Sequence, residues 1–210
     1  MKKTDILKYF IIFSLLSGIM GCGKDGPGGP SNEVLELIEQ AWSKFEAATS
    51  DYTEALSDFS EAINLDSNVA DAYVGKGWCY ARSASGPNNI NYDLAIDLWK
   101  QAASKDSESV DAYAGLALVY NVKNDYANSI LYADNALELE SAYIFNHDTE
   151  ITWRDLQLVK AHSYYYLGIY DEVAAVLDIL LPLLNHPVDQ PEILLARMQE
   201  LFDANQASVK

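Results

Sequence analysis

Small and apolar residues recur along this chain at the spacing of an α-helix. Tyr52, Ala55, Phe59 and Ala62 follow one another at steps of three, four and three residues, which places all of them on one helical face. The same pattern returns at three later places: Tyr92, Ala95, Trp99 and Ala102; Tyr126, Ser129, Ala133 and Ala136; and Tyr170, Val173, Leu177 and Leu180. The sequence therefore predicts an all-α protein built from a repeated helical unit.

The intervals between copies give the length of the repeat and locate two insertions. The four copies lie 40, 34 and 44 residues apart, whereas a second set (Tyr73, Gly77, Tyr80) returns once, 40 residues later. A basic period of 34 residues explains these intervals if the segment SGPNNI (85–90) adds six residues and YIFNHDTEIT (143–152) adds about ten. A generic helical bundle has no reason to keep the same residue types at a fixed period.

This pattern resembles the tetratricopeptide repeat, a helix–turn–helix unit with Gly and Tyr in its first helix and Ala, aromatic, Ala in its second. Residues 70–109 match it best, through Tyr73, Gly77, Tyr80, Ala95 and Trp99. The resemblance implies a right-handed α-α superhelix of about four helix pairs, at about 36–69, 70–109, 110–143 and 154–187. The proline that usually closes each unit is absent, and the first helix of the first unit is degenerate.

Residues 188–210 follow the last repeat as a predicted capping helix and tail. Ile193, Leu194, Met198, Leu201 and Phe202 form an apolar stripe at helical spacing. A repeat buries its apolar face only against a neighbour, so the last repeat needs such a cover.

The N-terminus carries a targeting signal. Two lysines precede twelve mostly apolar residues, a length typical of a secretory signal and too short to span a membrane. Ile19-Met20-Gly21-Cys22 then resembles the bacterial lipobox. That resemblance implies cleavage after residue 21 and acylation of Cys22, with chains such as palmitate, although an ordinary secretory signal with an incidental cysteine is the alternative. Residues 22–35, rich in Gly and Pro, would form a flexible tether.

These features predict a lipid-anchored protein of the bacterial cell envelope. In a Gram-negative organism, Gly23 rather than Asp after the cysteine favours the outer membrane. The formal charge of −17 argues against binding to nucleic acid or to anionic headgroups through a basic patch.

No motif for catalysis, for metal binding or for a cofactor stands out in the sequence. The three histidines have no metal-ligand or nucleophile spacing, and the two cysteines form no zinc pair. We therefore expect a protein that is not an enzyme and needs no cofactor.

The resemblance also implies a partner-binding groove lined by the first helix of each unit. Its expected residues are Asp71, Val74, Trp78 and Arg82 in the second unit, Asp111, Leu118 and Asn121 in the third, and Asp155, His162 and Tyr165 in the fourth; Glu36, Glu39, Ser43 and Glu46 would add to it from the first unit. Such a groove, acidic along one edge and apolar in its middle, suits a basic and apolar protein segment. Trp78 is the expected anchor, unless its ring packs against the 85–90 insertion.

Two functions are compatible with these features. The first is a scaffold or adaptor that holds another envelope protein or peptide near the membrane. The alternative is a ligand-binding lipoprotein that captures a glycan or small solute for transport, using rings such as Trp78, Tyr165, Tyr166, Tyr143 and Phe145.

Overall fold

The structure, a computed structural model, describes residues 29–207. Two compact units divide the chain, Met1–Ser31 and Asn32–Lys210, and all the helices described below belong to the second. The signal segment 1–21, the lipidation residue Cys22 and most of the tether lie outside the described residues. Among the helices that are described, none is long and apolar enough to cross a membrane.

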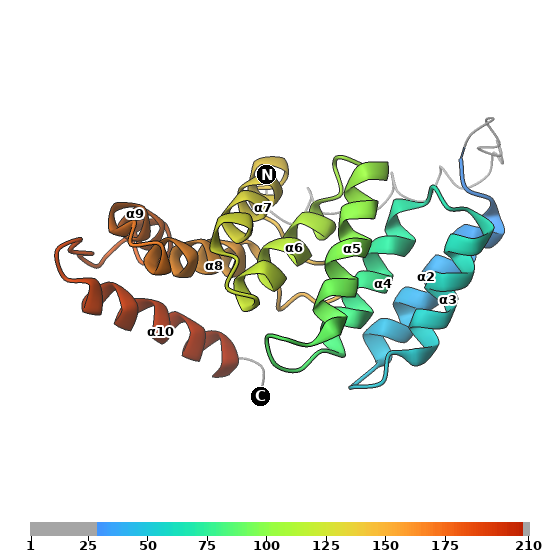
Figure 1. Cartoon of the computed structure of the whole chain (residues 1–210), viewed down its shortest axis with the longest axis horizontal. Coiled ribbons are helices and arrows are strands. Elements are labelled where there is room, and N and C mark those ends of the chain that lie inside the picture. The colour runs from blue at the N-terminus through green and yellow to red at the C-terminus, as the bar shows by residue number, and fades with distance from the viewer. Residues whose placement is uncertain (1–28, 208–210) are drawn as a thin grey trace, which may run out of the picture. The chain divides into compact units, whose positions relative to one another are not determined.

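The unit Asn32–Lys210 consists of helix pairs packed in chain order (Figure 1). The pairs are α2 (Asn32–Ala47) with α3 (Thr53–Leu65), α4 (Ala70–Arg82) with α5 (Ile90–Lys105), α6 (Val110–Val122) with α7 (Tyr126–Leu139), and α8 (Trp153–Tyr166) with α9 (Tyr170–Leu180). The second helix of each pair packs on the next pair, and the first helices, α2, α4, α6 and α8, here called the inner helices, also contact one another in turn; the second helices are here called the outer helices. The predicted all-α architecture of four helix pairs is confirmed.

The repeated sequence positions form the core between the helices. Ala55, Phe59 and Ala62 of α3 are at most 1% exposed. Their counterparts on α5 are Ala95, Trp99 and Ala102, on α7 Ser129, Ala133 and Ala136, and on α9 Val173, Leu177 and Leu180, all of them at most 5% exposed. The recurrence in sequence thus reflects one packing position used four times.

The largest of these side chains, Trp99, is wedged between neighbouring inner helices. Its indole N–H donates to the Val74 carbonyl at 3.2 Å. A Cβ atom added to Gly77 on α4, or to Gly115 on α6, would lie 2.5 Å from the nearest atom of this indole. Both positions therefore lack a side chain because the ring occupies that space.

The turns between units repeat as well. Asp66 Oδ1 accepts from the backbone N–H of Asn68 at 2.8 Å, and Asp106 Oδ1 accepts from that of Glu108 at 2.9 Å. The Tyr73 hydroxyl donates to the Ser67 carbonyl, six residues earlier, and Tyr113 makes the same bond to Ser107 in the next unit. In the absence of the usual proline, these hydrogen bonds hold the turn between units.

Helix α10 (Pro191–Ala207) closes the row by packing against α8 and α9. Leu194 and Met198 are at most 1% exposed, and Leu201 and Phe202 pack beside them. The predicted capping helix is thus confirmed, and it covers the face that a further unit would otherwise cover.

Candidate functional site

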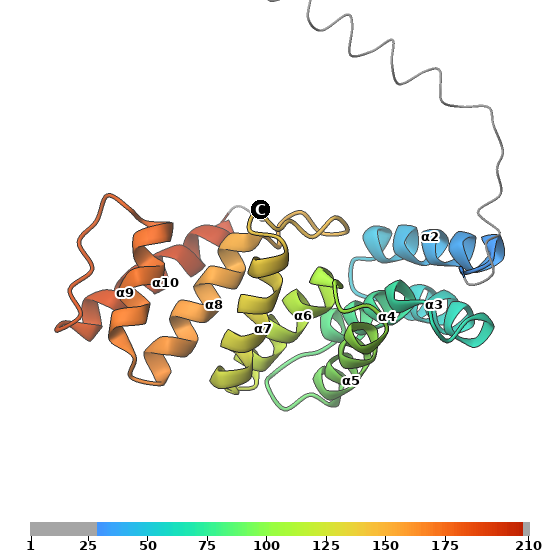
Figure 2. The same ribbon diagram turned by 90° about the horizontal axis from the view of Figure 1, so that it is seen from above.

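The longest connection within the unit runs from α7 to α8, and its residues 143–152, here called the inserted loop, lie against the inner helices. The backbone N–H of Phe145 donates to Ile151 O at 2.9 Å, and that of Trp153 donates to Tyr143 O at 2.7 Å. Ile144 and Thr152 form an isolated antiparallel bridge. The loop is therefore a narrow hairpin, and Figure 2 shows it reaching from α7 towards α2 on the side away from α5.

Phe145 anchors the inserted loop in an aromatic cluster. Its ring is 0% exposed and stacks on Trp78 of α4, with ring centroids 4.5 Å apart and an interplanar angle of 22°. Trp42 and Phe45 of α2 approach it edge-on, at 5.9 and 6.4 Å. Aromatic burial of this kind is a large contribution to docking, so Phe145 joins the loop to two units at once.

Tyr143 and His147 extend these contacts to either side. The Tyr143 hydroxyl donates to Asp111 Oδ1 of α6 at 2.8 Å. The His147 ring stacks on Trp42 at 3.7 Å between centroids, and its Nδ1 lies 2.7 Å from Glu46 Oε1. Three alternate residues of the loop thus contact three successive inner helices, α6, α4 and α2.

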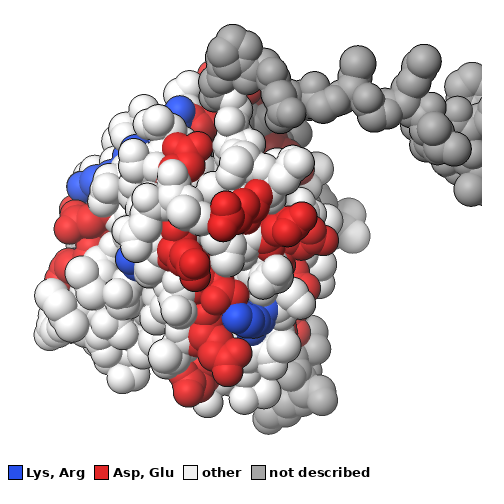
Figure 3. Space-filling model, turned by 90° about the vertical axis from the view of Figure 1, so that its right-hand side faces the viewer, with Lys and Arg blue, Asp and Glu red and all other residues white. Residues whose placement is uncertain are grey.

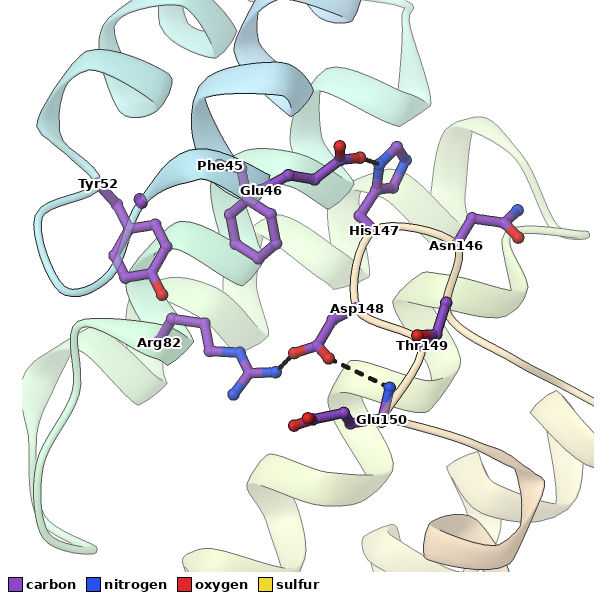
Figure 4. Close-up of a pocket in the computed structure, with 10 residues that line it drawn as sticks. Phe45, Glu46, Tyr52, Arg82, Asn146, His147, Asp148, Thr149 and Glu150 are labelled. Carbon is purple, nitrogen blue, oxygen red and sulfur yellow. Dashed lines mark hydrogen bonds and ion pairs between the residues drawn. The ribbon is translucent and has the colours of Figure 1, made fainter. Parts of the chain in front are cut away.

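Ion pairs hold the outer edge of the loop. Asp148 pairs with Arg82 at the end of α4, and Figure 4 shows this pair beside the His147–Glu46 contact at the mouth of a cavity of about 500 Å³. Arg82 and Asp148 are 38% and 22% exposed, and Glu46 is 51% exposed. Ion pairs this accessible contribute little, about 0–1 kcal/mol each.

The surface of α2, α4 and α6 beneath the loop, here called the inner groove, is acidic. The carboxyl pKa values of Asp71 and Asp111 are raised because neighbouring groups remove water from these side chains. Hydrogen bonds from Trp42 Nε1 to Asp71 (3.1 Å) and from Tyr143 to Asp111, together with nearby His147, oppose that rise. Asp71 also keeps part of its surface exposed. Because both carboxylates have lost part of their hydration, a cationic group of a ligand would bind favourably between them.

Six of the expected groove residues are gathered around the inserted loop: Glu46, Asp71, Val74, Trp78, Arg82 and Asp111. Trp78, the expected anchor, is buried, at 3% exposed. Phe145 covers it on one side and Trp99 contacts it on another, at 5.1 Å. The ring thus packs against an insertion, the one at 143–152. Val74 is also buried, at 3% exposed.

Glu39 and Ser43 line a cavity beside His147, and the expected residues of the third and fourth units other than Asp111 lie elsewhere along the inner helices. Asn121 of α6 bonds to α8, with its Nδ2 3.1 Å from His162 Nδ1 and 2.9 Å from Ser163 Oγ. Asp155 accepts from the Thr152 backbone N–H at 2.8 Å and caps α8. Tyr165 contacts Tyr170 of α9, and Leu118 packs partly buried against the core. Asn121 and Tyr165 thus contact neighbouring helices.

Sequence reasoning missed the residues that fill the groove. Neither Trp42 nor His147 was among the expected groove residues. The available signal was the alternation of aromatic residues at 143, 145 and 147 inside an insertion, which is typical of an extended segment with one buried face. Because Tyr143 and Phe145 are at most 1% exposed, these two rings cannot stack on a sugar while the loop is docked.

No group of His, Cys, Asp or Glu in the described part of the chain is arranged to hold a metal ion. The buried Cys79 is a free thiol whose pKa is raised to about 12 by loss of solvation, which makes it a poor nucleophile.

Comparison with known proteins identifies the fold. No family model and no curated protein matches the chain. Solved structures do match: the crystal structure of MamA has a TM-score of 0.57 at 17% identity, covering 79% of this chain and 82% of MamA. TTC0263, described as a thermophilic TPR protein in Thermus thermophilus, gives 0.55 at 14% identity, covering 80% and 82%. A third structure, MamA MSR-1 C2, gives 0.57 at 14%, covering 83% and 89%. The fold is that of a tetratricopeptide superhelix, as the repeats predicted.

Proposed function

We propose that this tetratricopeptide superhelix is a lipid-anchored scaffold of the bacterial cell envelope, tethered through Cys22, that binds a segment of another envelope protein. The observation that supports the proposal is the inner groove, where side chains from three successive units converge on one extended segment, residues 143–147. Tetratricopeptide proteins in general act as protein-binding scaffolds, and a groove built in this way recognises extended chains.

The charge distribution indicates the chemistry of the partner. Residues 32–66 contain nine acidic side chains and one basic side chain, Lys44, which already pairs with Asp58 at 2.5 Å. Figure 3 shows acidic side chains spread over the end of the unit formed by α2 and α3. This end of the unit would attract a basic and apolar partner segment and would increase the rate at which that segment associates.

The anchor is tested by metabolic labelling with a radioactive palmitate in the native host. We expect labelled protein in the membrane fraction, and we expect the Cys22→Ser variant to lose both the label and the membrane association. Retention of the label by the variant would place the acyl group elsewhere and contradict the anchor.

The scaffold function is tested by a photo-crosslinking amino acid placed at Ser43 in the living cell. Ser43 is exposed and lines the groove beside Glu39, whereas Ser57 is also exposed but lies on the outer helix α3. We expect a discrete crosslinked protein from Ser43 that is absent from the matched Ser57 control. Identical products from both positions, or none from Ser43, would contradict a partner in the groove.

A charge reversal then tests the chemistry of that partner. Glu39→Lys and Glu46→Lys place cations in the groove, and Glu54→Lys and Glu61→Lys make the same change on α3. We expect only the first pair to reduce the Ser43 product, because like charges oppose a basic segment.

A further inference from the structure

We propose that the inserted loop is an internal ligand of the inner groove, which it shares with an external partner by competition. The partner would be an extended segment with aromatic side chains at two alternate positions and a cationic side chain two residues further on. This inference rests on the proposed scaffold function, and it adds the recognition pattern and the means of regulation.

The loop binds the groove as a peptide strand would. Tyr143, Phe145 and His147 point inward, while the intervening Ile144 and Asn146 are exposed. Alternation with period two is the property of an extended chain that lies on a surface, and it gives a partner three side-chain positions to match. The contacts come from α6, α4 and α2 in turn, so this stretch of the loop crosses the units.

The third of these positions suits a cation. His147 stacks on Trp42, its Nδ1 contacts Glu46, and Trp42 in turn donates to Asp71. An arginine there could stack on the same indole and pair with the carboxylates around it. Histidine is the weaker occupant, because imidazole is charged only when protonated.

The loop fits the groove imperfectly. The indole N–H of Trp78, beneath Phe145, is buried and has no hydrogen-bond partner. A buried donor without an acceptor is unfavourable, so a segment that supplied a carbonyl there would have an advantage over the loop. The outer edge of the loop is held by the exposed Arg82–Asp148 and Glu46–His147 pairs, which are weak in water.

The groove continues beyond the loop at both ends. A cavity of about 510 Å³ lies beside His147 and is lined by Leu35, Ile38 and Glu39 of α2. Another, of about 350 Å³, lies beside Ile144 and reaches Glu108, in the turn before α6, and Val110, the first residue of α6. A partner longer than the loop would fill space that the loop leaves empty, and this favours displacement.

The first experiment offers the loop to the groove in trans. The probe is an acetylated, amidated peptide of residues 141–152, and the protein is residues 23–210, which contain the whole compact unit Asn32–Lys210. The loop-released variant carries Tyr143→Ser, Phe145→Ser and His147→Ser. Its matched control carries Ile144→Ser, Asn146→Ser and Thr149→Ser, three exposed positions of the same loop.

We expect the released variant to bind the peptide at least about tenfold more tightly than the wild type or the control, because an occupied groove lowers apparent affinity by the fraction of time it is open. Replacing His147 of the peptide by arginine should strengthen binding, and alanine at its two aromatic positions should abolish it. Equal binding by all three proteins, or none by a released variant with native helical content, would overturn the proposal.

The second experiment uses the wild type alone, in case the released variant does not fold. Amide hydrogen exchange should be about a hundredfold or more faster at Phe145, Ile151 and Trp153 than at the buried helix α6, because displacement requires local opening of the loop. An excess of the arginine peptide should accelerate the loop amides further. Loop amides that exchange only at the rate of α6 would make the loop a permanent part of the core, and the proposal would be wrong.

The two proposals fail separately. If the peptide binds in trans but Ser43 crosslinks to no partner, the loop would still be a ligand of the inner groove, and the scaffold function would be refuted. A crosslinked partner whose yield is the same in the wild type and in the released variant would support the scaffold and overturn the competition.

Discussion

The substitution Gly77→Ala tests the packing that fixes the repeat. The added Cβ atom would lie 2.5 Å from Trp99 Nε1 and 2.8 Å from Trp99 Cδ1, well inside van der Waals contact. Trp99 is 0% exposed, and a Cβ atom added to Gly115 of α6 would also lie 2.5 Å from its indole. The buried ring is therefore confined between α4 and α6.

Two opposing effects set the expected size of the change. Alanine in place of glycine stabilises a helix by about 1 kcal/mol. Overpacking a filled core costs about 1–3 kcal/mol, and a trapped indole places this site at the upper end of that range. The net result is a loss of about 2 kcal/mol, which in a domain of this size lowers Tm by roughly 4–8 °C.

Urea unfolding of residues 23–210, followed by circular dichroism, measures this loss. Gly29→Ala is the matched control, because a Cβ atom there has nothing within 4 Å, and it should leave the midpoint unchanged. In a double-mutant cycle, Trp99→Phe should reduce the cost of Gly77→Ala, since the smaller ring vacates space. A Gly77→Ala protein as stable as the wild type would refute the steric argument.

Three further predictions follow from buried ionisable groups. Because burial raises the pKa of the Cys79 thiol to about 12, a disulfide reagent at pH 8 should label it in urea but not in the native protein; rapid native labelling would show that the thiol is accessible. Burial lowers the pKa of His162, so as the pH falls below about 6.5 this imidazole is protonated in the unfolded chain before it is protonated in the folded protein. The stability of the wild type should therefore fall more steeply over that range than the stability of His162→Gln. Parallel pH profiles of the two proteins would contradict this. Asp111→Asn keeps an acceptor for the Tyr143 hydroxyl and removes a carboxylate whose burial is unfavourable, as the raised pKa of this carboxyl shows. The Tm of the variant at pH 7 should therefore equal or exceed that of the wild type, and the difference should shrink as the pH is lowered and Asp111 becomes protonated. A lower Tm of the variant at pH 7 would mean that the charge itself stabilises the loop.

Much of the architecture could be predicted because it is encoded locally. The steps of three, four and three residues that place Ala95, Trp99 and Ala102 on one face of α5 are visible in any single copy, and repetition at a fixed period removes the ambiguity of one helix. The fold class and the capping helix were accessible for the same reason. The periods also located the insertions, since any excess over 34 residues has to lie between helices.

The candidate site was predicted only in part. The inner helices could be identified from the repeat, and Asp71, Arg82 and Asp111 do contact or border the segment that lies in the groove. The burial of Trp78 could not be predicted, because position within a repeat indicates which side of a helix faces inward, without indicating what covers it. The cover, Phe145, lies 67 residues further along the chain.

The sequence by itself determined the repeat, the helix pairs, the cap and the acidic character of the chain. The tertiary structure decided that an insertion occupies the inner groove. His147 meets Glu46 across 101 residues, a contact that no local periodicity encodes. Local patterns specify which face of a helix is apolar. Whether the groove is open or occupied depends on how well two distant surfaces match in shape and hydrogen bonding, and only folding brings those surfaces together.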